Sequence, residues 1–99
     1  MIDPTALAAA MNLHIGAEAP ADRRHVAHHD RVVLIGCVIE LSRPTPSLPD
    51  VARRMDTSHS TIHALWREWQ SWHWRIRHAW LQHGELSLAI AREGKGVAA

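Results

Sequence analysis

Apolar residues recur at helical spacing along most of the chain. Between residues 47 and 69 this repeat occupies two short segments, separated by Asp56-Thr57-Ser58. The apolar positions are Leu48, Val51, Ala52 and Met55 before the break, and Ile62, Leu65 and Trp69 after it. A spacing of three and four residues predicts two amphipathic helices joined by a short turn. This is the pattern of a helix-turn-helix, whose second helix enters the major groove of DNA.

The preceding sequence predicts two more helices. Asp3-Pro4 is a typical helix start, because aspartate caps and proline fits the first turn. An Ala-rich helix from Thr5 to His14 should follow. We expect the central helix over Ala21 to Ser42, since most of its faces are apolar. A strand is the alternative for Val32 to Ile39, which is rich in β-branched residues.

The boundaries of the later helices are also predicted. The prolines of residues 43–46 should end the central helix, after which Ser47 caps the next one. Ser58 should cap a long helix that reaches His83, where Gly84 stops it, with a bend near Ser71 or a protruding end. A short helix is expected over residues 85–92 and a disordered tail over 94–99.

These elements together predict an all-α domain of about five helices. Three parts are expected: a short helix and linker over residues 1–20, the helix-turn-helix domain over 21–83, and a short helix and disordered tail over 84–99. The chain has 99 residues, which suits a single core. We expect no membrane span, because no apolar run approaches the roughly 20 residues that a bilayer requires.

The cysteine content indicates a cellular compartment, and the charge indicates a kind of partner. Cys37 is the only cysteine, so a reducing cytoplasm is expected, and its place in an apolar run predicts a buried thiol. Residues 23–78 hold nine arginines and five acidic residues, a net charge of +4. Guanidinium groups match phosphate oxygens, although a solvated surface would explain the same charge.

Residues 31–69 resemble the C-terminal DNA-binding domain of the bacterial replication initiator DnaA, a relative of the Trp-repressor helix-turn-helix. That family shows an E-L pair, then S-L-P-E-I-G, and then D-H-T-T-V in the recognition helix. The corresponding segments here are Glu40-Leu41, Ser47 to Ala52 (SLPDVA) and Ser58 to Ile62 (SHSTI). The resemblance covers about forty residues and implies a stand-alone DNA reader that regulates replication or transcription.

The resemblance also implies a role for individual residues. His59, Ser60 and Thr61 would approach base edges in the major groove. Arg31 would enter the minor groove, which favours narrow A·T-rich DNA. Ser58 would cap the recognition helix, while Ser47 and Leu48 would lie against the phosphate backbone. The full set of DNA-binding candidates is Arg31, Ser47, Leu48, Thr57, Ser58, His59, Ser60, Thr61, His63 and Arg67.

Some positions depart from the family pattern. The loop is one residue shorter, and Thr57 replaces a basic residue. Ala64 stands where the family has a second histidine, and His63 precedes it. These differences concern the target sequence more than DNA binding itself. The ATPase module of the family has no counterpart, because the phosphate-binding G-x-x-x-x-G-K-[ST] loop is missing, so no nucleotide partner is expected.

Metal and catalytic chemistry are not expected. His25, His28 and His29 share one helix face and could in principle bind Zn²⁺. Solvated histidines, or a strip with Arg31 against the DNA backbone, are the favoured interpretation. The sequence lacks paired carboxylates, a glycine-rich phosphate loop and a nucleophile elbow, so we expect neither an enzyme nor a cofactor.

The five tryptophans fall within fifteen residues. A continuous helix would place Leu65, Trp69, Ile76 and Trp80 on one core stripe with Ile62. Trp66, Trp72 and Trp74 would lie off it, so they, or the N-terminal helix, are candidate homodimer contacts. This clustering also favours a rival function, in which a DnaA-like scaffold uses its Trp-rich helix to bind another protein, such as the initiator.

Overall fold

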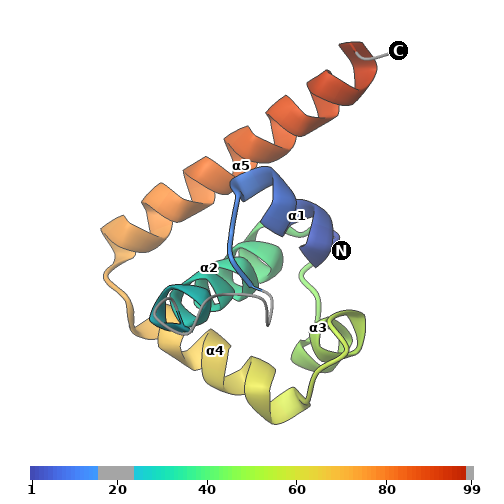
Figure 1. Cartoon of the computed structure of the whole chain (residues 1–99). Coiled ribbons are helices and arrows are strands. Elements are labelled where there is room, and N and C mark those ends of the chain that lie inside the picture. The colour runs from blue at the N-terminus through green and yellow to red at the C-terminus, as the bar shows by residue number, and fades with distance from the viewer. Residues whose placement is uncertain (16–23, 98–99) are drawn as a thin grey trace.

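The computed structural model describes the backbone of residues 1–15 and 24–97, and the side chains of 1–15 and 27–94. Within these residues it contains five helices and no strand (Figure 1). The helices are α1 (Pro4–Met11), α2 (Arg24–Leu41), α3 (Leu48–Arg54), α4 (His59–Ser71) and α5 (Trp74–Val97). The prediction of an all-α fold with about five helices is confirmed.

Helix α2 is the centre of the molecule. Helices α1, α4 and α5 pack around it, and α3 packs against α4 (Figure 1). Every residue from Val32 to Ile39 is buried, as expected for a helix that is covered on most faces. The strand alternative for this run is therefore wrong. The predicted start of this helix at residue 21 lies outside the described residues.

Three of the predicted caps are present. Asp3 accepts a hydrogen bond from the Ala6 amide at 3.2 Å, and Pro4 is the first helical residue. Ser47 accepts from the Asp50 amide and Ser58 from the Thr61 amide, each at 3.2 Å. These bonds satisfy backbone donors that a helix start leaves free. The sequence thus located the starts of α1, α3 and α4.

Helix α1 is shorter than predicted. It ends at Met11 rather than at His14, because Asn12 adopts the left-handed conformation, with φ of 57°. Leu7, Ala8 and Met11 are buried where α1 packs against α2 and α5. Helix α1 therefore contributes one face to the core of its own chain.

The predicted long helix is divided in two. Helix α4 ends at Ser71, and Trp72 has extended backbone angles before α5 begins at Trp74. The bend expected near Ser71 is thus confirmed. The break reorients the following residues, so the predicted core stripe is correct for Leu65 and Trp69 but wrong for Ile76, whose side chain is 51% exposed.

The predicted stop at Gly84 is wrong, since α5 continues through it to Val97. Gly84 is buried, and a Cβ there would lie 3.0 Å from Leu41 Cδ1 and 3.4 Å from the Met11 sulfur. This glycine allows close helix packing. A separate helix over 85–92 is consequently wrong, and residues 94–97 of the predicted tail are helical; residues 98–99 lie outside the described part.

Candidate nucleic-acid interface

The start of α4 presents a group of hydroxyl side chains. The Ser58 hydroxyl lies 2.7 Å from Thr61 Oγ1 and 3.2 Å from Ser60 Oγ. All three residues are exposed, as is His59. The buried side of the same helix carries Ile62, Leu65 and Trp69. The amphipathic pattern therefore fixes α4 in the core and leaves its small polar side chains on the surface.

Further along α4, polar side chains occupy the outer face. Ser60, His63 and Arg67 are spaced three and four residues apart, so they share one side of the helix, and all are exposed. The rings of His59 and His63 lie 6.1 Å apart between centroids. The structure thus brings four of the predicted DNA-binding residues onto one surface.

Arg31 lies beside the start of α4, although thirty residues separate it from Thr61. Both line a pocket of about 420 Å³ together with Thr57. The remaining lining residues are Ile15, Met55, Asp56, Ile62 and Leu65. Arg31 Nε donates to the Ile15 carbonyl oxygen at 3.1 Å. Residues from α2, the turn and α4 therefore meet at one place.

The turn between α3 and α4 has a specific backbone form. Asp56 is left-handed, with φ of 52°. The Asp56 amide donates to the Arg53 carbonyl at 3.2 Å, and the Thr57 amide donates to the Ala52 carbonyl at 3.0 Å. These two bonds form a Schellman motif, which ends α3 and directs the chain into α4. Sequence reasoning missed the role of Asp56, whose only signal is the tolerance of aspartate for this conformation.

The two candidates at the start of α3 differ in environment. Ser47 is exposed and uses its hydroxyl as the helix cap, whereas Leu48 is half-buried against the core. Leu48 therefore contributes to packing. Exposed arginines at the other end of α3 were not among the predicted residues: Arg53 pairs with Asp50, and Arg54 Nη2 lies 3.5 Å from Asp3 Oδ1.

The two histidines of the predicted strip whose side chains are described, His28 and His29, are both exposed. His28 Nε2 lies 2.9 Å from Glu68 Oε2 and so joins α2 to α4. The His29 ring stacks on Trp72, with 4.9 Å between centroids. The side chain of His25 lies outside the described ones. His28 and His29, like Arg31, thus also make contacts within the protein.

The three tryptophans predicted as dimer contacts differ in exposure. Trp66 and Trp72 are half-buried, and Trp72 packs on Trp69 with 5.6 Å between centroids. Trp74 is 60% exposed at the start of α5, and the Arg75 guanidinium lies 5.4 Å from its ring centroid. Of the three predicted contact tryptophans, Trp74 offers the largest exposed fraction.

Cys37 is buried within α2, as predicted. Its thiol lies 3.7 Å from the Trp80 carbonyl oxygen, to which it donates. Burial, with a smaller contribution from the nearby Glu40 carboxylate, raises the pKa of this thiol to about 12. The protonated thiol is a poor nucleophile.

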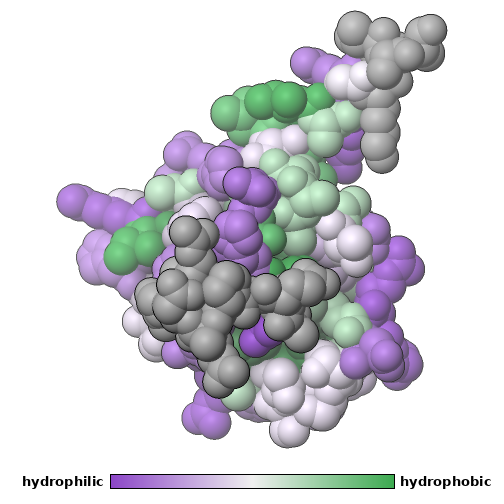
Figure 2. Space-filling view, viewed as in Figure 1, coloured by the Kyte–Doolittle hydropathy of each residue, from purple (hydrophilic) through white to green (hydrophobic). Residues whose placement is uncertain are grey.

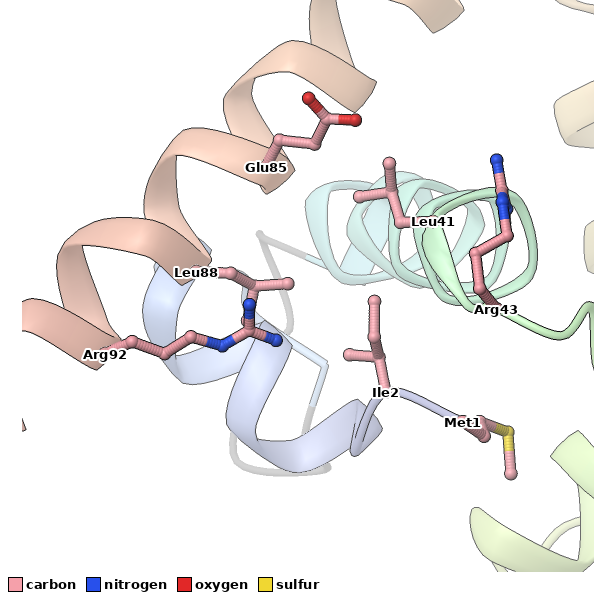
Figure 3. A pocket seen from close by; sticks show the side chains of 7 residues that line it. All are labelled: Met1, Ile2, Leu41, Arg43, Glu85, Leu88 and Arg92. Atoms are coloured by element: carbon pink, nitrogen blue, oxygen red, sulfur yellow. The ribbon is translucent and has the colours of Figure 1, made fainter.

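A second pocket, of about 420 Å³, lies between the start of α1, the end of α2 and α5 (Figure 3). Its lining residues are Met1, Ile2, Leu41, Arg43, Glu85, Leu88 and Arg92. Ile2, Leu41 and Leu88 face its middle, while charges of both signs approach from different sides. The polar groups do not converge on one point, so this pocket adds nothing to the candidate interface.

No helix of the described residues is long and apolar enough to cross a membrane. Within the same part of the chain, no three histidine, cysteine, aspartate or glutamate side chains gather as a metal site. Comparison with protein-family models, curated proteins and solved structures finds no match. The function is therefore inferred from the geometry of α2, α3 and α4.

Proposed function

We propose that this chain binds double-stranded DNA in a sequence-specific way through a DnaA-like helix-turn-helix formed by α3 and α4. It would act as a non-enzymatic regulator of replication or transcription in the cytoplasm. The observation that carries the proposal is the start of α4, where Ser60 and Thr61 are exposed beside Arg31. Small side chains there leave room for the backbone to approach base edges.

The position of Arg31 supports a second contact. Its side chain is half-exposed next to the turn that leads into α4. With α4 in a major groove, a guanidinium at its side would reach the neighbouring backbone or minor groove. The Ile15 carbonyl engages only Nε, one of several donors on this group.

The distribution of charge supports phosphate contact. Arg53, Arg54 and Arg67 are all exposed on α3 and α4. The first backbone amides of each helix add partial positive charge at its start. The start of α4, together with these three exposed arginines, favours a polyanion as partner.

A salt-titrated anisotropy assay tests the proposal with a DnaA-box duplex, a scrambled duplex and a pool of random duplexes. Thr61→Ala and Arg31→Ala should each lose about 1–3 kcal/mol on the preferred sequence. Thr5→Ala and Arg92→Ala are matched controls, since both residues are exposed on helices away from α4. The absence of binding to any duplex at low salt would overturn the proposal.

A rival proposal is a protein-interaction module that uses the Trp-rich segment. The exposed Trp74 and the loss of a basic residue at Thr57 favour it. In that case the chain would bind a protein such as the initiator, and Trp74→Gln would abolish that binding while Thr61→Ala would not. Surface plasmon resonance with immobilised initiator separates the two proposals.

Dimerisation is part of the DNA-binding proposal, because helix-turn-helix proteins commonly read two half-sites. Trp66 and Trp72 are half-buried within the chain, and α1 uses one face in the core. Among the surfaces predicted for a dimer, Trp74 and the outer face of α1 are left available.

A further inference from the structure

Helix α5 is the longest helix among the described residues and has two unequal faces. Its 24 residues extend about 36 Å, and its end projects from the body (Figure 1). Gly84 and Ser87 are buried against the rest of the chain. On the outer face, Ile76, Leu86 and Ile90 are 51%, 59% and 59% exposed. Figure 2 shows the corresponding apolar surface on the projecting part of this helix.

The exposed apolar residues form one stripe. At 3.6 residues per turn, Ile76, Ala79, Leu86 and Ile90 fall within an arc of about 80°. Ile76, His83 and Ile90 repeat every seven residues, as do Ala79 and Leu86. Two seven-residue series that are offset by three residues are the pattern of a helix that packs along a partner helix. We define these five residues as the α5 stripe.

The charges beside the α5 stripe indicate what the partner is. Arg75 lies near the start of α5 and Glu93 near its end, and both are exposed. They lie at the same edge of the stripe, about five turns apart. Arg75 lies near the positive end of the helix dipole and Glu93 near its negative end, so the dipole destabilises both charges. A neighbouring helix of opposite direction and identical sequence would place Glu93 beside Arg75, and Arg75 beside Glu93.

The sizes of the side chains agree with this arrangement. In the register that pairs Arg75 with Glu93, Ile90 lies within one residue of the level of the small Ala79 of the second copy, and Leu86 lies within one residue of the level of His83. A parallel arrangement would instead bring Arg75 level with Arg75 and Glu93 level with Glu93, so neither charge would gain a partner of opposite sign.

We infer that the α5 stripe binds a second copy of this chain, with the two α5 helices antiparallel about a two-fold axis. The same surface then serves both copies, as in an isologous interface. This inference stands apart from DNA binding, because it uses no residue of α3 or α4. It places the interface along the α5 stripe rather than on the tryptophans.

Sedimentation equilibrium of the full chain tests the apolar part of the inference. The average mass should rise with concentration from 11.1 kDa toward twice that value. The double variant Leu86→Gln/Ile90→Gln should remain monomeric. Trp74→Gln is the matched control, since Trp74 is an exposed apolar residue of α5 outside the stripe, and it should still dimerise. A monomeric wild type, or a dimer lost only with Trp74→Gln, overturns the inference.

Charge reversal tests the antiparallel arrangement. Arg75→Glu and Glu93→Arg should each raise the dissociation constant several-fold, and the two together should restore it. Each substitution introduces the charge that the helix dipole favours at that end of α5. Weaker association would therefore not reflect a less stable helix. Circular dichroism checks the fold of every variant. Failure of the double reversal to restore the dimer contradicts the antiparallel pairing.

Discussion

The indole ring of Trp69 lies directly against the backbone of Gly36. A Cβ at residue 36 would come within 2.1 Å of Trp69 Cδ2, and Trp69 Nε1 donates to Glu40 Oε2 at 2.5 Å. The glycine and the carboxylate, one turn apart on α2, thus position a single fully buried ring. This pair joins α2 to α4, the helix proposed to read DNA.

Gly36→Ala should therefore destabilise the protein. The ring is rigid and fully buried, so overpacking should cost about 3 kcal/mol. The control is Gly94→Ala in α5, where nothing lies within 4 Å of the new methyl group. It should gain about 0.5–1 kcal/mol, because alanine is the better helix residue. Urea unfolding measures the free energy of unfolding of both variants. If the two variants were equally stable, the predicted clash at residue 36 would be contradicted.

Asp56→Gly should stabilise the protein by about 1 kcal/mol, because glycine adopts the left-handed conformation without a Cβ penalty. The matched control is Ala64→Gly, at an exposed position inside α4. There glycine should cost about 1 kcal/mol. Thermal unfolding gives both values. A loss of stability at residue 56 would mean that the aspartate side chain, rather than its backbone angles, maintains the turn.

Cys37 should be unreactive in the folded protein. Burial raises the pKa of its thiol from 9.0 to about 12, so the native state holds this proton more tightly than the unfolded chain does. Its contribution to stability is complete below pH 9 and is lost as the pH rises toward about 12. A thiol reagent such as DTNB at pH 8 should react only after urea is added. Rapid labelling without urea would disprove the burial of the thiol.

Arg67→Ala separates phosphate contact from base reading. As a phosphate contact it should weaken binding about equally on all duplexes, and lower the slope of log affinity against log salt by about 1. Thr61→Ala should instead act mainly on the preferred sequence. Anisotropy titrations at several salt concentrations compare the two. An unchanged salt slope for Arg67→Ala would remove this residue from the phosphate contacts.

Local signals in the sequence were sufficient for most helix starts. Ser47 and Ser58 precede amphipathic repeats, and the caps form where these residues stand. The break after Ser71 was also expected, since one small domain cannot cover a helix of that length. These features depend on neighbouring residues and on chain length, both of which are read directly from the sequence.

Features that depend on distant residues were not predicted. Gly84 was interpreted as a helix stop, yet its position is set by Leu41 and Met11, more than forty residues away. His29 is exposed, as expected, but its stacking on Trp72 was not predicted. The approach of Arg31 to Thr61 was not predicted either, because no local pattern links α2 with α4.

The joint between α4 and α5 consists of two residues, and Trp72 within it is held by Trp69 on one side and His29 on the other. These ring contacts therefore restrict the angle between the proposed reading helix, α4, and the proposed dimer helix, α5. Two chains joined through α5 would hold their α4 helices at a set separation. Such an assembly would measure the distance between half-sites, and inserted base pairs would cost it affinity even where each half-site is intact.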